Sequence, residues 1–157
     1  METITTQKVL DKYNGFCKQP SDINEHLPVL AKLAVECDHV TEMGVRAVVS
    51  TWALILGNPE VLRCYDIHKN RNIEEAIVEA LAASIDMKFI EADVLKVEIE
   101  ETDMLFIDTL HQYSQLKKEL ALHAKKVKKY LAFHDVETYG VNGEPAEWQT
   151  PEIMKNY

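Results

Sequence analysis

The sequence predicts an α/β fold in three layers, in which helices cover both faces of a five-stranded, largely parallel sheet. Apolar runs of strand length alternate with segments of helical spacing along most of the 157 residues. The apolar runs are continuous, which is typical of strands buried on both faces of a parallel sheet. This length fits one domain with one hydrophobic core, and no second domain is evident.

Two helices are expected before the first strand. The first covers Thr3–Tyr13. The second follows the segment KQPSDINEH, where Leu27, Leu30, Leu33 and Ala34 recur at helical spacing. These helices form an N-terminal segment, residues 1–37.

Strand and helix then alternate. A helix that starts at Val49 ends at Gly57, with Pro59 just beyond it. The next helix starts at Asn72 and has acidic residues in its first turn. A lysine cluster at 125–129 is expected to end a third helix, where cations suit the dipole. The predicted strands are His39–Val45, Val61–Ile67, Met87–Leu95, Asp103–Thr109 and Lys129–Val136, and the helices are Val49–Gly57, Asn72–Ile85 and Tyr113–Val127.

The core of the domain is therefore expected at residues 38–136. Residues 137–157 have no strand-like run and are expected to form a loop or tail, with room for a short terminal helix.

The composition of the chain disfavours several classes of protein. The net charge of −9 argues against a nucleic-acid partner, and no apolar run has the roughly 18 residues of a membrane span. The polar N-terminus is no signal peptide, so a cytoplasmic location is expected. The three scattered cysteines predict neither disulfides nor structural zinc.

Acidic side chains recur near the carboxyl ends of the predicted strands. In an open parallel sheet, ligands bind beyond those ends, so five acids there indicate a site. The five are Glu42, Asp66, Asp93, Asp108 and Asp135.

Asp66 ends the second strand, about twenty residues beyond the turn at Gly44, which is the place of a ribose-binding carboxylate in nucleotide-binding sheets. An acid that ends a strand by chance is the alternative. The turn has one glycine where dinucleotide-binding sheets have three, which disfavours a pyrophosphate on the backbone. A cofactor without phosphate fits better.

Two histidines accompany these acids. Asp108 is followed by His111 in FIDTLHQY, and His134 precedes Asp135 in YLAFHDV. Parallel strands bring both ends to one edge of the sheet, where the four side chains can converge. Capping or core packing is the alternative reading for each histidine taken alone.

The motifs EMG, YDI, ADVL, IDTLHQY and HD, in this order, resemble those of class I S-adenosylmethionine-dependent methyltransferases. More narrowly, the stretch from Ser21 to Glu144 is similar to the sugar and natural-product O-methyltransferase branch related to cephalosporin-biosynthesis and macrolide enzymes. The resemblance implies a Rossmann-like sheet of strand order 3-2-1-4-5. It also implies S-adenosylmethionine as cofactor and a small molecule or sugar as methyl acceptor.

Residue roles follow from the resemblance. It implies that Asp66 holds the ribose hydroxyls and that Asp108 borders both cofactor and metal. Glu42 and Gly44 would border the methionine part, Ser50 and Thr51 would face its carboxylate, Ile67 would pack on the adenine, and Asp93 and Val94 would meet the adenine edge.

The resemblance also implies a divalent ion on Asp108, His134 and Asp135, with His111 as general base. His134 occupies the position where the metal-dependent enzymes of this O-methyltransferase branch have an acidic residue. Imidazole is a softer ligand than carboxylate, so manganese, or no metal, becomes a better candidate than magnesium. A neutral histidine near pH 7 can accept the proton of the acceptor hydroxyl.

After Val136 only 21 residues follow, where such methyltransferases continue with a helix and two strands. A minimal five-strand form, a homo-oligomer whose partner supplies the strands, and a truncated chain that only binds the cofactor are all open. The function hypotheses are therefore an O-methyltransferase and, alternatively, an inactive cofactor-binding or interaction module. A flavodoxin-like receiver ranks below both, because the chain lacks the clustered acids expected at the end of the first strand and the lysine expected after the fifth strand.

Overall fold

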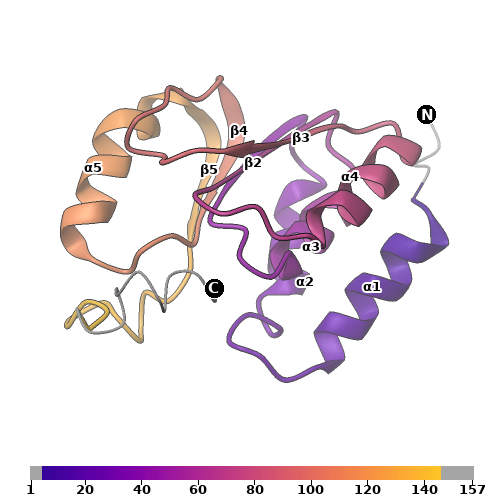
Figure 1. The fold of residues 1–157 in the computed structure, drawn as a ribbon, viewed down its shortest axis with the longest axis horizontal. Coiled ribbons are helices and arrows are strands. Elements are labelled where there is room, and N and C mark those ends of the chain that lie inside the picture. The colour runs from indigo at the N-terminus through magenta and orange to yellow at the C-terminus, as the bar shows by residue number, and fades with distance from the viewer. Residues whose placement is uncertain (1–4, 146–157) are drawn as a thin grey trace.

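The computed structural model describes residues 5–145, and its centre is a five-stranded sheet (Figure 1). The strands lie in the order β3-β2-β1-β4-β5, and all four neighbouring pairs are parallel. This confirms the predicted α/β fold and strand order. The strands are β1 (His39–Met43), β2 (Val61–Asp66), β3 (Asp86–Glu91), β4 (Thr102–Ile107) and β5 (Val127–Phe133).

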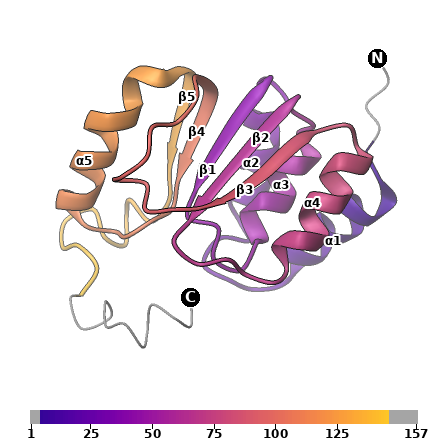
Figure 2. The ribbon, with the colours of Figure 1, turned by 45° about the horizontal axis from the view of Figure 1, so that its top comes forward.

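Helices lie on both sides of the sheet (Figures 1 and 2). The helices α1 to α4 lie on one side of the sheet, and α5 lies on the other beside β4 and β5, which completes the three predicted layers. None of the helices within residues 5–145 combines the length and the hydrophobicity needed to cross a membrane. The helices are α1 (Gln7–Lys18), α2 (Leu27–Ala34), α3 (Val49–Leu56), α4 (Ile73–Ala82) and α5 (Tyr113–His123), followed by the 3-10 turn η1 (Ala124–Lys126).

Two apolar clusters hold the layers together. Trp52 and Leu54 of α3 belong to the larger one, which also takes Val40 of β1. Met43, three residues further along β1, belongs to the smaller cluster with Leu105 of β4. Successive strand residues point to opposite faces, so one strand supplies both clusters. Burial on both faces accounts for the continuous apolar runs.

Several element boundaries differ from the prediction, and two of the observed boundaries have a clear local cause. The first helix starts at Gln7, because the Oγ1 of Thr6 accepts a hydrogen bond from the backbone N–H of Val9 at 3.3 Å and caps it. The predicted start at Thr3 lies outside the described residues. β3 ends at Glu91, because Oδ1 of Asp93 accepts from the backbone N–H of Leu95 at 2.9 Å and turns the chain.

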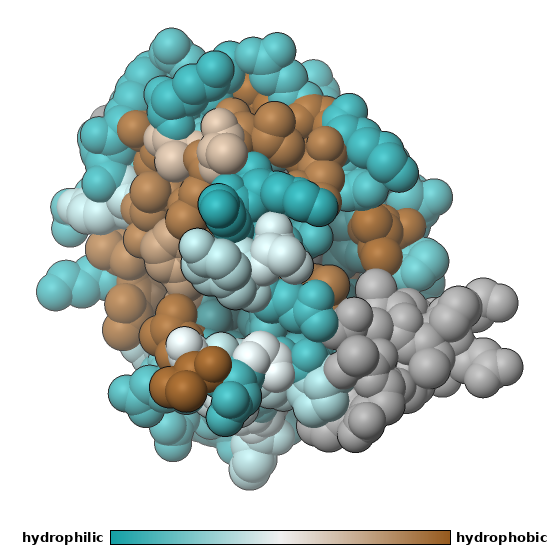
Figure 3. Space-filling view, turned by 90° about the vertical axis from the view of Figure 1, so that its left-hand side faces the viewer, coloured by the Kyte–Doolittle hydropathy of each residue, from teal (hydrophilic) through white to brown (hydrophobic). Residues whose placement is uncertain are grey.

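The lysine cluster does not end a helix as predicted. α5 stops at His123, and β5 starts at Val127, so Lys128 and Lys129 lie in the strand. β5 is the last strand of the sheet, and charged side chains on an edge strand disfavour pairing with other strands. Apolar side chains are also visible on the side of the molecule that carries α5 (Figure 3). Leu122 of α5 and Leu131 of β5 are exposed. The expected homo-oligomer stays a prediction.

Candidate active site at the carboxyl edge of the sheet

A cavity of about 460 Å³ lies beyond the carboxyl ends of the strands. Eight of the residues predicted for the site line it. They are Gly44, Asp66, Ile67, Asp93, Val94, Asp108, His111 and Asp135. Residues at or just beyond the ends of all five strands thus meet in one space, at the place where parallel sheets bind ligands.

Gly44 allows the turn after β1 to approach β4 closely. Its φ is +88°, and a Cβ atom built there would lie 2.0 Å from the backbone oxygen of Asp108. Any other residue would clash and would be strained. The glycine therefore brings the first turn against the start of the β4 loop, and both border the cavity.

Asp66 orders the same turn from the end of β2. Its Oδ2 accepts hydrogen bonds from the backbone N–H groups of Val45 at 2.8 Å and Arg46 at 2.9 Å. Its Oδ1 accepts from the N–H of His68 at 3.0 Å. Each carboxylate oxygen has lone pairs for more than one donor, so Asp66 can also accept from a ligand hydroxyl.

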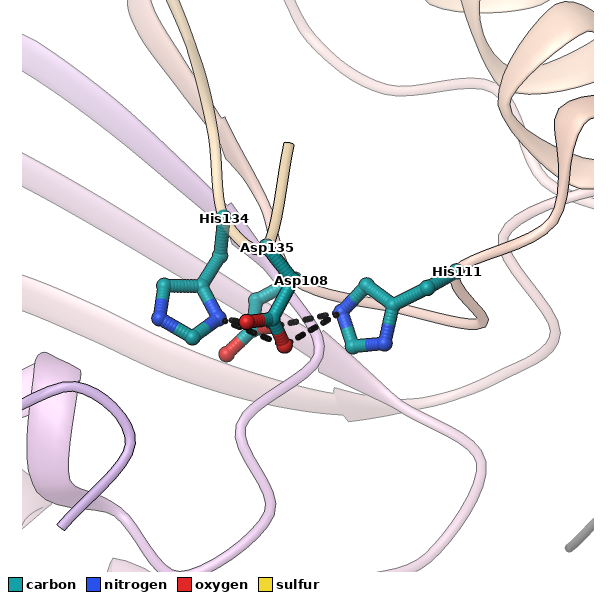
Figure 4. Close-up of side chains that lie close together, drawn as sticks. All are labelled: Asp108, His111, His134 and Asp135. Carbon is teal, nitrogen blue, oxygen red and sulfur yellow. Dashed lines mark hydrogen bonds and ion pairs between the residues drawn. The ribbon is translucent and has the colours of Figure 1, made fainter. Parts of the chain in front are cut away.

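The structure brings Asp108, His111, His134 and Asp135 together (Figure 4). Nε2 of His111 lies 3.0 Å from Oδ1 of Asp108, and Nδ1 of His134 lies 3.2 Å from the same oxygen. Nδ1 of His134 is also 3.2 Å from Oδ2 of Asp135. One nitrogen or oxygen of each residue lies within 4.8 Å of the other three. We call these four residues the histidine–aspartate cluster.

Charges inside the cluster shift each other's pKa. Burial alone would raise the pKa of Asp108, but the hydrogen bond with His111 and the neighbouring imidazole of His134 outweigh it and lower the value to about 2. Burial alone would lower the pKa of His134, but Asp108 and Asp135 outweigh it and raise the value to about 9. The pKa of His111 is raised for the same reason, despite its own burial. Without a metal, the cluster therefore favours protonated histidines between ionised carboxylates.

The second ring nitrogen of His111 meets a residue that the sequence did not indicate. Nδ1 lies 3.2 Å from Oε2 of Glu144, which also accepts from the backbone N–H of His111 at 3.2 Å. The ring of Tyr139 stacks on the imidazole with centroids 5.0 Å apart. Both residues come from the predicted tail, which has no periodic pattern that could have indicated them.

The N-terminal segment borders the cluster from the other side. Nε2 of His134 lies 3.1 Å from the backbone oxygen of Asp22, and the ring of His26 contacts that of His134 edge-on at 5.3 Å. The side chain of Asp22 binds Arg46 at 2.6 Å. Asp22 lies in the segment between α1 and α2, since α2 starts at Leu27.

Glu42, Ser50 and Thr51 do not line the cavity, in contrast to their predicted roles. Glu42 is fully buried and accepts hydrogen bonds from Oγ of Ser50 at 2.5 Å and Oγ1 of Thr51 at 2.8 Å. Glu42 stands one residue before the end of β1, and strand alternation turns its side chain under α3. Burial raises its pKa to about 7, partly offset by these hydrogen bonds.

A buried histidine supports the opposite wall. His123 of α5 is 1% exposed, and its Nε2 lies 2.8 Å from the backbone oxygen of Val94. Its ring holds the loop after β3, whose residues Asp93 and Val94 border the cavity.

Comparisons with known proteins show the fold. No profile of a known protein family matches the chain, and no curated protein matches it in sequence. Among solved structures, it is similar to the N-methyltransferase NodS from Bradyrhizobium japonicum WM9 in complex with S-adenosyl-L-homocysteine. The two are 17% identical with a TM-score of 0.59, over 82% of this chain and 71% of that one.

Two further solved methyltransferase structures are similar to the chain. The methyltransferase PaMTH1 from Podospora anserina, bound to S-adenosylhomocysteine, is 16% identical with a TM-score of 0.55, over 96% of this chain and 72% of that one. An O-methyltransferase from Bacillus cereus, in complex with the same compound, is 16% identical with a TM-score of 0.50, over 77% of this chain and 64% of that one. The chain therefore has the Rossmann-like fold of these methyltransferases. The comparisons do not single out the sugar and natural-product branch.

Proposed function

We propose that the chain is an S-adenosylmethionine-dependent methyltransferase that acts on a hydroxyl group of a small molecule. One observation carries the proposal. His111 lines the 460 Å³ cavity at the strand ends and also a neighbouring cavity of about 190 Å³. A candidate base thus stands between a space for the cofactor and a space for an acceptor.

The larger cavity suits the cofactor. Asp66 would accept hydrogen bonds from both ribose hydroxyls, while Ile67 packs on the adenine. Asp93 and Val94 would meet the adenine edge. The positive sulfonium would lie toward the carboxylates of Asp108 and Asp135, where it gains Coulomb energy. The S-adenosylhomocysteine complexes among the similar structures support this choice of cofactor.

The smaller cavity suits the acceptor. Apolar side chains of Leu110, Leu116, Phe133 and Val136 line much of it, and His111 borders it. An empty apolar cavity of roughly 150 Å³ can hold a benzene ring. A space of about 190 Å³ therefore accommodates one six-membered ring with a hydroxyl directed at His111.

The transfer needs one proton acceptor. The acceptor oxygen attacks the methyl carbon, the carbon–sulfur bond breaks, and its electron pair stays on sulfur to give S-adenosylhomocysteine. The hydroxyl proton passes to Nε2 of neutral His111. Glu144 accepts from Nδ1 and so orients the neutral imidazole, and Asp108, beside Nε2, stabilises the imidazolium that forms.

The histidine–aspartate cluster also fits a divalent ion. Nδ1 of His134 is buried without a hydrogen-bond partner of good geometry, and Asp108 and Asp135 stand on the same side of it. Mixed imidazole and carboxylate ligands favour manganese or another transition metal over magnesium. A bound ion would lower the pKa of the acceptor hydroxyl. His111 would then act as base only if it stays outside the metal's ligand sphere.

Calorimetry with S-adenosylhomocysteine tests the cofactor assignment without knowledge of the acceptor. We expect Asp66→Ala to weaken binding roughly 10–100-fold, the effect of losing hydrogen bonds to a charged group. Glu91→Ala is the matched control, because Glu91 is the β3 register partner of Asp66 and does not line the cavity.

Absence of binding to the wild-type chain would contradict the proposal. Equal affinity in the wild type and Asp66→Ala would contradict the assigned ribose site. Binding without any methyl transfer, with or without manganese, would favour the alternative of an inactive cofactor-binding module.

A further inference from the structure

One arginine stands out in the 460 Å³ cavity. Among the described residues that line it, Arg46 is the only lysine or arginine. Six carboxylates surround the same space. They are Asp22, Asp66, Asp93, Asp108, Asp135 and Glu144. In a cavity with this many carboxylates, the guanidinium offers a permanent positive charge beside which an anionic group of a ligand is attracted.

One partner of the Arg46 side chain is the carboxylate of Asp22. Its Nη2 lies 2.7 and 2.6 Å from the two carboxylate oxygens of Asp22. The two side chains are 38% and 41% exposed, and ion pairs that are this exposed contribute little to stability. The ion pair with Asp22 can therefore be exchanged for another carboxylate at small cost.

The main chain of Arg46, in contrast, is fixed. Its N–H donates to Oδ2 of Asp66 at 2.9 Å, and the residue has a φ of 43° in the turn after Gly44. Asp66 thus holds the start of the arginine side chain next to its own carboxylate. The candidate ribose ligand and the cation are parts of one hydrogen-bonded unit.

We propose that Arg46 binds the α-carboxylate of S-adenosylmethionine, and that Asp22 holds the guanidinium until the cofactor replaces it. This inference rests on the proposed function and adds the residue that recognises the amino-acid end of the cofactor. A guanidinium matches a carboxylate with two parallel hydrogen bonds. Ser50 and Thr51, which the resemblance assigns to this carboxylate, bind Glu42 and lie outside the cavity.

Calorimetry with two probes tests the inference. S-adenosylhomocysteine has the carboxylate, and 5′-methylthioadenosine lacks the whole amino-acid part. We expect Arg46→Ala to weaken S-adenosylhomocysteine binding roughly 10–100-fold and to change 5′-methylthioadenosine binding less than about twofold. Asp22→Asn should tighten S-adenosylhomocysteine binding a few-fold, because it removes the competing carboxylate. The control is Arg71→Ala, an exposed arginine outside the cavity.

The outcomes separate this inference from the proposed function. If the wild type binds S-adenosylhomocysteine and Arg46→Ala binds it equally well, the inference is wrong and the cofactor site stands. If Arg46→Ala weakens the binding of both probes equally, Arg46 acts through the shape of the turn. That result would also overturn the inference. If the wild type binds neither probe, the proposed cofactor site itself is contradicted, whatever the role of Arg46.

Discussion

Replacing His111 by glutamine is expected to lower methyl transfer by roughly 10²–10⁴-fold, the usual contribution of a general base. Glutamine can still donate a hydrogen bond to Asp108, but it cannot accept a proton. S-adenosylhomocysteine should bind the variant within about twofold of the wild-type affinity. A loss of rate without a loss of cofactor binding would identify His111 as a group that takes part in the chemical step.

The dependence of the methyl-transfer rate on pH gives a second test of the role of His111. Asp108, Asp135 and Glu144 raise the pKa of His111 above 6.5, so a growing fraction becomes neutral only as the pH rises past that value. Wild-type transfer should therefore increase with pH through the neutral range, and the glutamine variant should lose this dependence. The measurement is transfer of a labelled methyl group to a panel of single-ring phenols and methyl glycosides.

His39→Gln is the matched control, because His39 begins β1 at the opposite end of the sheet. It should keep the wild-type rate and pH profile. Wild-type activity in His111→Gln would remove His111 from the mechanism, and a pH profile that persists in the variant would assign the titration to another group.

Asp108→Ala is expected to abolish manganese binding. Asp108 is the centre of the histidine–aspartate cluster, since Nε2 of His111 and Nδ1 of His134 both face its Oδ1. Loss of a direct ligand should exceed the roughly 10–100-fold that outer-shell partners contribute. Electron paramagnetic resonance of free manganese gives the affinity, and Asp11→Ala, on the exposed surface of α1, is the control.

Proton competition gives a second readout of the same site. A metal ligand must be deprotonated, and the pKa of His134 is raised to about 9. Manganese affinity of the wild type should therefore rise with pH up to about 9. Unchanged manganese binding in Asp108→Ala, or affinity independent of pH, would exclude a metal on this cluster.

The sequence predicted those parts of the site that follow from periodicity. Apolar runs locate the strands, and parallel strands share an edge, so Asp66, Asp108 and Asp135 could be placed together before the structure was known. The same reasoning misplaced Glu42. Its position near the end of β1 is right, but the alternation of side chains turns it under α3, away from the edge.

The remaining site residues could not be predicted because no periodic pattern positions them. Glu144 and Tyr139 belong to a segment without regular structure that returns to His111. Asp22 lies 24 residues from Arg46 and meets it only after the N-terminal segment has packed beside the cavity. Contacts of this kind depend on how the loops pack against the folded sheet. Loop sequences vary and carry little information about that packing.

The central claim is that the cofactor cavity and the histidine–aspartate cluster form one site. Nuclear magnetic resonance of S-adenosylmethionine labelled with ¹³C at the transferable methyl group, titrated with manganese, tests this directly. Manganese on the cluster should strongly broaden the methyl signal of the cofactor bound to the wild type, and the broadening should disappear in Asp108→Ala. A bound cofactor whose methyl signal stays sharp while the wild type binds manganese would show that the two lie apart, and would contradict the account.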